Sequence, residues 1–90
     1  MDARREVRIA NPSGMHARPC SAFVTLASEF ESDLRVSYEG REVNGKSILE
    51  LMTLCAPKGA TLLLQAAGED ADRQVGSLAE LVEGGFGEGT

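Results

Sequence analysis

The hydrophobic patterns of the sequence predict an α+β fold: an open-faced β-sandwich whose four-stranded antiparallel sheet carries three helices on one face. Three observations predict it. Apolar residues alternate in strand-length runs, they recur at spacings of three and four in longer segments, and the resulting order is β-α-β-β-α-β-α. Helices with one apolar stripe must bury it against a sheet, which leaves the other sheet face to water.

Four strands are predicted, at residues 5–10, 34–38, 41–43 and 60–67. In the first, Val7 and Ile9 alternate with charged residues, which is typical of a half-buried strand. Glu39 and Gly40 provide a tight turn between the second strand and the third. The fourth is a nearly continuous apolar run, so we expect it in the interior of the sheet.

Each helix is predicted from an apolar stripe and from residues suited to its ends. The first begins just after His16, because Pro19 then falls in the first turn, where its missing N–H is no loss. The second spans residues 47–55, where Ser47 and Glu50 have the form of a capping box. The third spans residues 71–82, and the acidic Asp70 suits its N-terminus.

The composition describes a single small domain. The 90 residues, 42% of them hydrophobic, suffice for one core, and we treat 1–90 as one domain with a frayed, glycine-rich end at 84–90. Nine basic and 14 acidic residues give a net charge of −5 without a basic block, which argues against nucleic-acid binding. We see neither an apolar run of about 18 residues nor a signal peptide, so we expect a cytoplasmic protein that does not enter a membrane.

The two cysteines, Cys20 and Cys55, are too few for a disulfide framework. With a single histidine in the chain, they cannot complete a closed zinc site either, and we expect no metal or cofactor. Both thiols are interpreted as small buried side chains of a reducing compartment. Cys20 in particular shares the apolar helix face with Phe23 and Ala27.

The single histidine, His16, lies in residues 14–19, Gly-Met-His-Ala-Arg-Pro, where a loop enters the first helix. Unpaired N–H groups and the helix dipole make such a position an anion site. The same positive end disfavours an imidazolium, so we expect a neutral, nucleophilic ring near neutral pH. Arg18 could contact the same anion through bidentate donors, and Gly14 lets the loop bend and leaves room for a phosphate.

The sequence around His16 also allows interpretations other than an anion site. It could be a polar residue at a helix end, with Arg18 a solvated charge. A catalytic triad would need an orienting acid and an activated nucleophile, and nothing in the sequence activates Ser13 or Ser21. An anion-binding or phosphoryl-accepting histidine is the functional interpretation that is left.

Residues 14–19 resemble the active-site signature of the HPr family, the histidine-containing phosphocarriers of the phosphoenolpyruvate-dependent sugar phosphotransferase system. Residues 43–54, Val-Asn-Gly-Lys-Ser-Ile-Leu-Glu-Leu-Met-Thr-Leu, resemble its second signature, around a regulatory serine. Lys58, Gly59 and Ala60, with the run that follows, are similar to the last strand of the family. Order and spacing agree over residues 5–83.

The resemblance implies that His16 accepts a phosphoryl group on Nδ1 from phosphorylated enzyme I and donates it to a sugar-specific EIIA domain. Arg18 would stabilise the phosphoryl charge, helped by the backbone amides of Ala17 and Arg18. Such a chain is no enzyme but a covalent intermediate in a relay, and we expect a monomer because a shuttle must dissociate after each transfer. Ser47 would be a target for an HPr kinase/phosphorylase as well as a helix cap.

The resemblance also implies a docking surface on the first two helices. It would comprise the exposed positions Ala17, Ser21, Thr25, Ser28, Ile48, Leu49 and Met52, whereas Leu51 and Leu54 belong to the core. Many members of the family carry basic residues around this surface, and this chain instead has Thr25, Ser28 and Glu50. Docking could therefore be weaker, or the partner different.

Three hypotheses follow. The first is a sugar-transport phosphocarrier, and the second is a regulatory relative in which phosphorylation of His16 signals the carbon or nitrogen state. The third is a binding module of the ferredoxin-like type, because the element order is shared by unrelated functions. The third predicts that His16 is dispensable, and the first two predict that it is essential.

Overall fold

The computed structural model describes residues 2–87, and these form one four-stranded sheet with three α-helices on it. The elements, in chain order, are β1 (Asp2–Arg8), α1 (Ala17–Ala27), β2 (Asp33–Tyr38), β3 (Arg41–Asn44), α2 (Ile48–Thr53), β4 (Thr61–Ala67) and α3 (Ala71–Glu83). The predicted order is confirmed. The largest difference is that β1 begins three residues early, because Asp2 to Arg4 pair with the end of β4 although their side chains do not alternate visibly.

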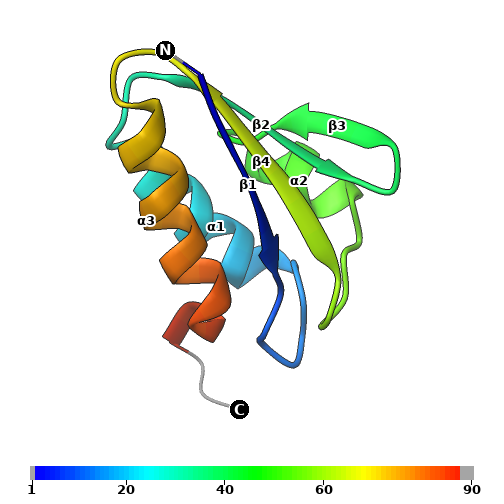
Figure 1. Cartoon of the computed structure of the whole chain (residues 1–90). Coiled ribbons are helices and arrows are strands. Elements are labelled where there is room, and N and C mark those ends of the chain that lie inside the picture. The colour runs from blue at the N-terminus through cyan, green and yellow to red at the C-terminus, as the bar shows by residue number, and fades with distance from the viewer. Residues whose placement is uncertain (1, 88–90) are drawn as a thin grey trace.

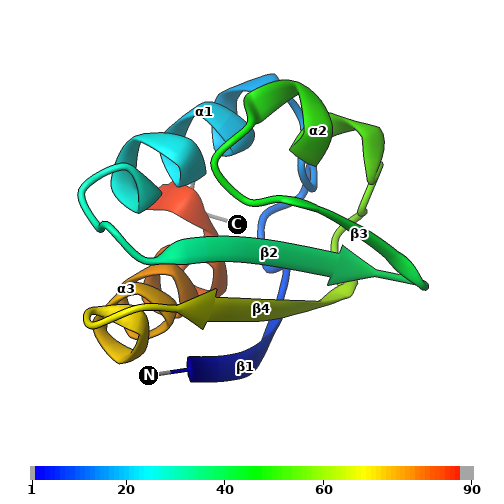
Figure 2. The same ribbon diagram turned by 90° about the horizontal axis from the view of Figure 1, so that it is seen from above.

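The sheet has the strand order β1-β4-β2-β3, and all three neighbouring pairs are antiparallel. β4 therefore lies in the interior, as its apolar run predicts. The helices pack on one face, with α3 against β1 and β4 and α2 against β3 (Figure 1). Figure 2 shows α1 and α2 next to each other on that side of the sheet.

The core between the sheet and the helices is almost entirely aliphatic. Alternate residues of the strands point into it, and the helices add their apolar stripes. The fully buried large side chains include Val7, Val36, Leu62 and Leu64 from the sheet and Phe23, Leu51, Leu78 and Val82 from the helices. Leu51 and Leu54 belong to this core, as predicted.

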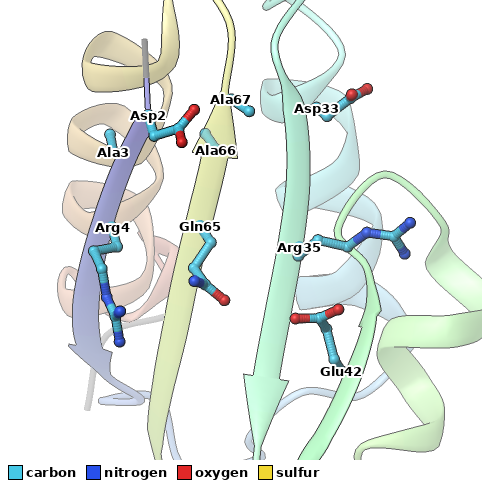
Figure 3. Close-up of a pocket in the computed structure, with 9 residues that line it drawn as sticks. All are labelled: Asp2, Ala3, Arg4, Asp33, Arg35, Glu42, Gln65, Ala66 and Ala67. Atoms are coloured by element: carbon cyan, nitrogen blue, oxygen red, sulfur yellow. The ribbon is translucent and has the colours of Figure 1, made fainter.

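The opposite face of the sheet is open and charged (Figure 3). Arg4 on β1 and Arg35 on β2 lie in register on either side of Gln65 on β4. Together with acidic neighbours such as Asp33 they surround a shallow hollow of about 470 Å³. The polar face predicted from strand alternation is thus confirmed, and this hollow shares no lining residue with the one at His16.

The C-terminal end differs from the frayed tail expected over residues 84–90. The N–H of Gly84 donates to the Glu80 carbonyl, and Gly85–Gly87 form a short 3-10 turn, η1. Phe86 in this turn packs against the core, which supplies the apolar contact that holds the turn in place. Residues 88–90 lie outside the described residues.

The Asp70 side chain joins the loop before α3 to the loop between α1 and β2, and it makes no capping hydrogen bond to α3. Its carboxylate accepts hydrogen bonds from the backbone N–H groups of Glu31 and Ser32, at 2.8 and 2.9 Å. Nε2 of the buried Gln74 donates to the carbonyl of Ser32 at 3.0 Å. Hydrogen bonds from the Ser32 hydroxyl and from the Glu31 amide lower the pKa of the Asp70 carboxyl from 3.8 to about 2.

Substitution of Asp70 by Asn should therefore lower the stability of the chain at neutral pH. The pKa of the Asp70 carboxyl is about 2 in the folded chain, below its ordinary 3.8. The carboxylate therefore stabilises the chain fully when the pH is above its ordinary pKa. This stabilisation is lost as the pH falls through the pKa of the folded chain. Denaturant unfolding of both proteins, at neutral pH and in steps down to about pH 2, should show the two stabilities converging in acid. A constant difference across that range would contradict this role.

Candidate functional site

His16 is exposed and occupies the N-cap of α1. Its carbonyl accepts the N–H of Cys20 at 3.0 Å, which is the first hydrogen bond of the helix. The amides of Ala17 and Arg18 precede that bond, and Pro19 has no N–H to offer. The imidazole therefore stands beside a helix end that presents two backbone donors, as the sequence predicts.

The Ser13 hydroxyl contacts the His16 ring, with Oγ 2.6 Å from Nε2. Which of the two atoms donates depends on the tautomer of the ring. Nothing in the sequence predicts an activated Ser13, and the contact indicates a different role for it, which is to orient the imidazole. Sequence reasoning missed this role because a contact three residues away along a loop has no periodic signature.

The loop before His16 is joined to the segment that follows α2. The N–H of Met15 donates to the Ala56 carbonyl at 2.9 Å, and Met15 is buried. Gly14 has a φ of +66°, and a Cβ at that position would clash with the Ala56 carbonyl oxygen and the Pro57 backbone. The positive φ agrees with the predicted bend of the loop at Gly14, the room for a phosphate stays a prediction, and the close approach of the two backbones is a further requirement for glycine that the sequence does not reveal.

A shallow, mostly apolar hollow of about 350 Å³ lies beside the imidazole. It is lined by Ser13, Met15, His16, Met52, Cys55, Ala56 and Pro57. Met52 also belongs to the apolar side chains that α2 leaves exposed: Ile48 and Met52 are each 37% exposed and Leu49 is 78% exposed. The exposure predicted for these three residues is confirmed, and we call them the α2 patch. The patch thus reaches the histidine through Met52.

The two cysteines differ in environment. Cys20 is buried, as predicted, and burial raises the pKa of its thiol to about 11. The prediction that Cys55 is buried is wrong, because it is exposed and lines the hollow at His16. Cys55 directly follows the C-cap of α2, and its φ of +51° turns the chain away from the helix and the core.

Arg18 is exposed, but it lines a different hollow from that of His16. Its neighbours there are Ser21 and Thr25 on the outer surface of α1 and Leu81 on α3. The structure therefore places the backbone of Arg18 in the first turn of α1 beside His16, while the residue lines a neighbouring hollow rather than the one at the imidazole. The other first-helix positions predicted to be exposed, Ala17, Ser21, Thr25 and Ser28, are exposed.

Ser47 caps α2, but only half of the predicted capping box forms. Its Oγ accepts the N–H of Glu50 at 3.2 Å, as predicted. The Glu50 carboxylate accepts the N–H of Asn44 at 3.0 Å instead of that of Ser47. The prediction for Glu50 is wrong because the amide of Ser47 already donates to the Asn44 carbonyl in the turn before the helix.

The basic side chains next to α2 are engaged with backbone carbonyls. Lys46 Nζ donates to the Phe30 carbonyl and Arg41 donates to that of Thr53, each at 2.6 Å. Glu50 on α2 and Ser28 at the C-cap of α1 are both exposed, and the two helices pack against each other. This surface therefore has an apolar centre and few available positive charges.

Residues 2–87 contain no helix long and apolar enough to cross a membrane. Within the same residues, no cluster of three or more His, Cys, Asp or Glu side chains could hold a metal ion.

Comparison with known proteins relates the whole chain to one family. The family model described as "PTS HPr component phosphorylation site" matches residues 3–84. The phosphocarrier protein HPr of Neisseria meningitidis is 40% identical over 86 residues, which cover 96% of this chain and 97% of that protein. The same name belongs to a Borreliella burgdorferi protein that is 40% identical over 80 residues, or 89% of this chain and 93% of that protein.

Solved structures agree with this relationship. The crystal structure of HPr-C-His from Thermoanaerobacter tengcongensis is 36% identical, covers 98% of this chain and 99% of its own, and has a TM-score of 0.93. Crh of Bacillus subtilis, a catabolite repression protein that forms a swapped dimer, is also 36% identical, at 90% and 93% coverage and a TM-score of 0.76.

Substitution of Gly14 by Ala should destabilise the chain more than the same change at Gly40. Gly40 has a φ of +81° but no atom within 4 Å of an added Cβ, so Gly40→Ala meets only the left-handed penalty of roughly 1–2 kcal/mol. Gly14→Ala adds the clash with Ala56 and Pro57, which we expect to cost about 1–3 kcal/mol more. Denaturant unfolding measures both, and equal losses would show that the approach of the two backbones is not tight.

Proposed function

The chain belongs to the HPr family of phosphocarriers of the phosphotransferase system, and on that premise we propose that His16 takes up a phosphoryl group and delivers it to another protein. The observation that carries the proposal is the exposed imidazole at the open end of α1, inside the segment that matches the family's phosphorylation site. The donor would be phosphorylated enzyme I and the acceptor an EIIA domain.

The transfer is an exchange of one phosphorus–nitrogen bond for another. Nδ1 of His16 attacks the phosphorus with its lone pair, and the donor imidazole, protonated on its other nitrogen, departs with the electrons of the bond that breaks. The His16 ring then gives up its Nε2 proton, so that both rings end neutral. A ring whose Nε2–H donates to the Ser13 hydroxyl holds its lone pair on Nδ1, and the 2.6 Å contact is compatible with this tautomer. The chain acts as a covalent intermediate of the relay rather than as an enzyme.

The phosphoryl oxygens would be held by the amides of Ala17 and Arg18 at the start of α1, which complement negative charge. The Arg18 guanidinium would swing across the first turn of the helix from its present hollow to join them. Its exposure supports this motion, because a flexible arginine on the surface can change rotamer without disturbing the core. Phosphoryl transfer depends mainly on such positioning and charge stabilisation.

We propose that enzyme I and EIIA bind the surface formed by Ala17, Ser21, Thr25 and the α2 patch, which adjoins His16. Binding by a chain with Thr25, Ser28 and Glu50 in this region would rely more on apolar contact than on charge. A monomer in the cytoplasm suits a shuttle between such partners.

Regulation is the second candidate function, because this chain is also similar to the catabolite repression protein Crh. In that case phosphorylation would serve signalling rather than sugar uptake. Ser47 would be the regulatory position, modified by an HPr kinase/phosphorylase. Its place as the cap of α2 supports this, since a phosphate is well tolerated at a helix N-terminus.

Incubation with enzyme I and phosphoenolpyruvate tests the primary proposal. We expect the wild-type chain to gain the mass of one phosphate, to lose it in acid, and to gain none after His16→Ala. Arg18→Ala should be phosphorylated more slowly, because it removes a donor to the phosphoryl group. Intact-mass spectrometry over time measures the phosphate gained by the wild-type chain and by each of the two variants. Phosphate uptake by His16→Ala, or none by the wild type, would refute the proposal.

Incubation with an HPr kinase and ATP tests the proposal for Ser47. The wild-type chain should gain an acid-stable phosphate that Ser47→Ala does not gain, whereas Ser28→Ala, which changes another serine of the same surface, should behave as wild type. Ser47→Ala also removes a helix cap, so a stability loss of about 1 kcal/mol is expected in denaturant unfolding. Modification of Ser47→Ala would assign the phosphate to another residue.

A further inference from the structure

We propose that Asn11 is a positioning residue for phosphoryl transfer, because it holds the turn that sets Ser13 against the His16 ring. The proposal rests on the function proposed for His16 and adds a residue that does not contact the phosphoryl group. The sequence pattern predicts only that Asn11 lies in a loop.

Asn11 closes the turn before His16 from both sides. Its side-chain Nδ2 donates to the Gly14 carbonyl at 2.8 Å, and its own carbonyl accepts the N–H of Gly14 at 3.2 Å. The side chain is completely buried, although it lies in a surface loop. The two bonds fix the ends of the turn, and Ser13 lies between them.

The Gly14 carbonyl links Asn11 to the histidine. It accepts the backbone N–H of His16 at 3.1 Å in addition to Nδ2 of Asn11. Asn11 thus governs both the backbone from which the imidazole projects and the turn that carries the Ser13 hydroxyl to Nε2. A change in the Asn11 side chain would therefore alter the position of the imidazole through the backbone and through Ser13. It would change no group that contacts the phosphoryl group.

The contribution of Asn11 to folding stability does not by itself explain why an amide side chain occupies this position. Within residues 2–87, Oδ1 of Asn11 is buried and finds no hydrogen-bond partner, which is unfavourable by roughly 1–3 kcal/mol. An apolar side chain of similar size would avoid that penalty, and the Gly14 carbonyl would keep the His16 amide as a donor. The amide is therefore better explained by what Nδ2 does for the turn.

The chemical consequence concerns the nitrogen that attacks phosphorus. When the Ser13 hydroxyl accepts the proton of Nε2–H, the lone pair stays on Nδ1 and the ring plane is fixed. A turn that loosens lets the ring rotate, so that Nδ1 is less often aligned with the phosphorus. Misplacement of a reacting group by about 1 Å can slow a reaction up to a hundredfold.

Asn11→Leu is the variant that separates the positioning role from the effect on stability, since it keeps the number and branching of the side-chain heavy atoms and removes both the Nδ2 bond and the orphaned Oδ1. Gln74→Leu is the matched control, because Gln74 is also a buried amide with an orphaned oxygen among the described residues. Gln74 donates a hydrogen bond to the Ser32 carbonyl near the start of α3, and it is not among the residues that line the hollow at His16. Ser13→Ala removes the ring contact directly.

Three measurements are made on each variant: denaturant unfolding, the kcat and KM for phosphorylation by enzyme I, and the ¹⁵N chemical shifts of the His16 ring in the unphosphorylated chain. We expect Asn11→Leu to unfold at or above the wild-type midpoint, to lose tenfold or more in kcat with unchanged KM, and to shift the ring signals as Ser13→Ala does. The double variant should be no slower than Ser13→Ala alone. Gln74→Leu should keep the wild-type kcat and ring signals whatever its stability.

A wild-type kcat in Asn11→Leu would overturn the proposal, and so would a slower reaction with unaltered ring signals. A loss of stability large enough to account for the lower kcat would assign Asn11 a structural role only. The ring spectrum needs no phosphoryl donor, so this proposal can fail while His16 remains the acceptor. Failure of the wild-type chain to take up phosphate would instead refute the proposed function.

Discussion

The site depends on one backbone contact, the hydrogen bond from the Met15 amide to the Ala56 carbonyl. It joins the loop before α1 to the segment after α2, which lie about forty residues apart along the chain. The imidazole comes from the first segment, Cys55 and Ala56 of the adjoining hollow come from the second, and Met52 comes from the end of α2 just before it. Gly14 is required because any side chain there would separate the two backbones. Without this junction the chain would have a histidine and an apolar patch but no surface that contains both.

The sequence predicts the fold well because most of its elements are encoded locally. Alternation places the strands, the three-and-four spacing places the helices, and the apolar run of β4 identifies the interior strand. It also predicts that His16 is exposed at a helix start, since Pro19 and the apolar stripe that follows fix where α1 begins. These features need only residues that are close together along the chain.

The features that the sequence could not predict depend on which partner a polar group takes and on where the backbone turns, neither of which has a periodic signature. The Glu50 carboxylate has the right spacing for a capping box, but the turn before α2 had already used the amide of Ser47. Asp70 is a plausible helix cap, yet a loop almost forty residues earlier along the chain takes its carboxylate. Cys55 is apolar enough to be buried, but the chain reverses there and turns the thiol outward. Residue type and spacing do not reveal which of several available partners a polar group will choose.

The chemistry at His16 and the choice of partner lie in different parts of the molecule. In the proposed function, the ring, its serine contact, the two helix amides and Arg18 would carry out the transfer of a phosphoryl group in the same way, whether it serves transport or signalling. Discrimination between partners must therefore come from the surrounding surface. There Lys46 and Arg41 are bound to carbonyls of their own chain, and the α2 patch offers Leu49 almost fully to solvent. On the proposed function, a protein that docks on this surface would gain little from opposite charge and much from covering apolar area, so we expect its shape at the α2 patch to decide between partners.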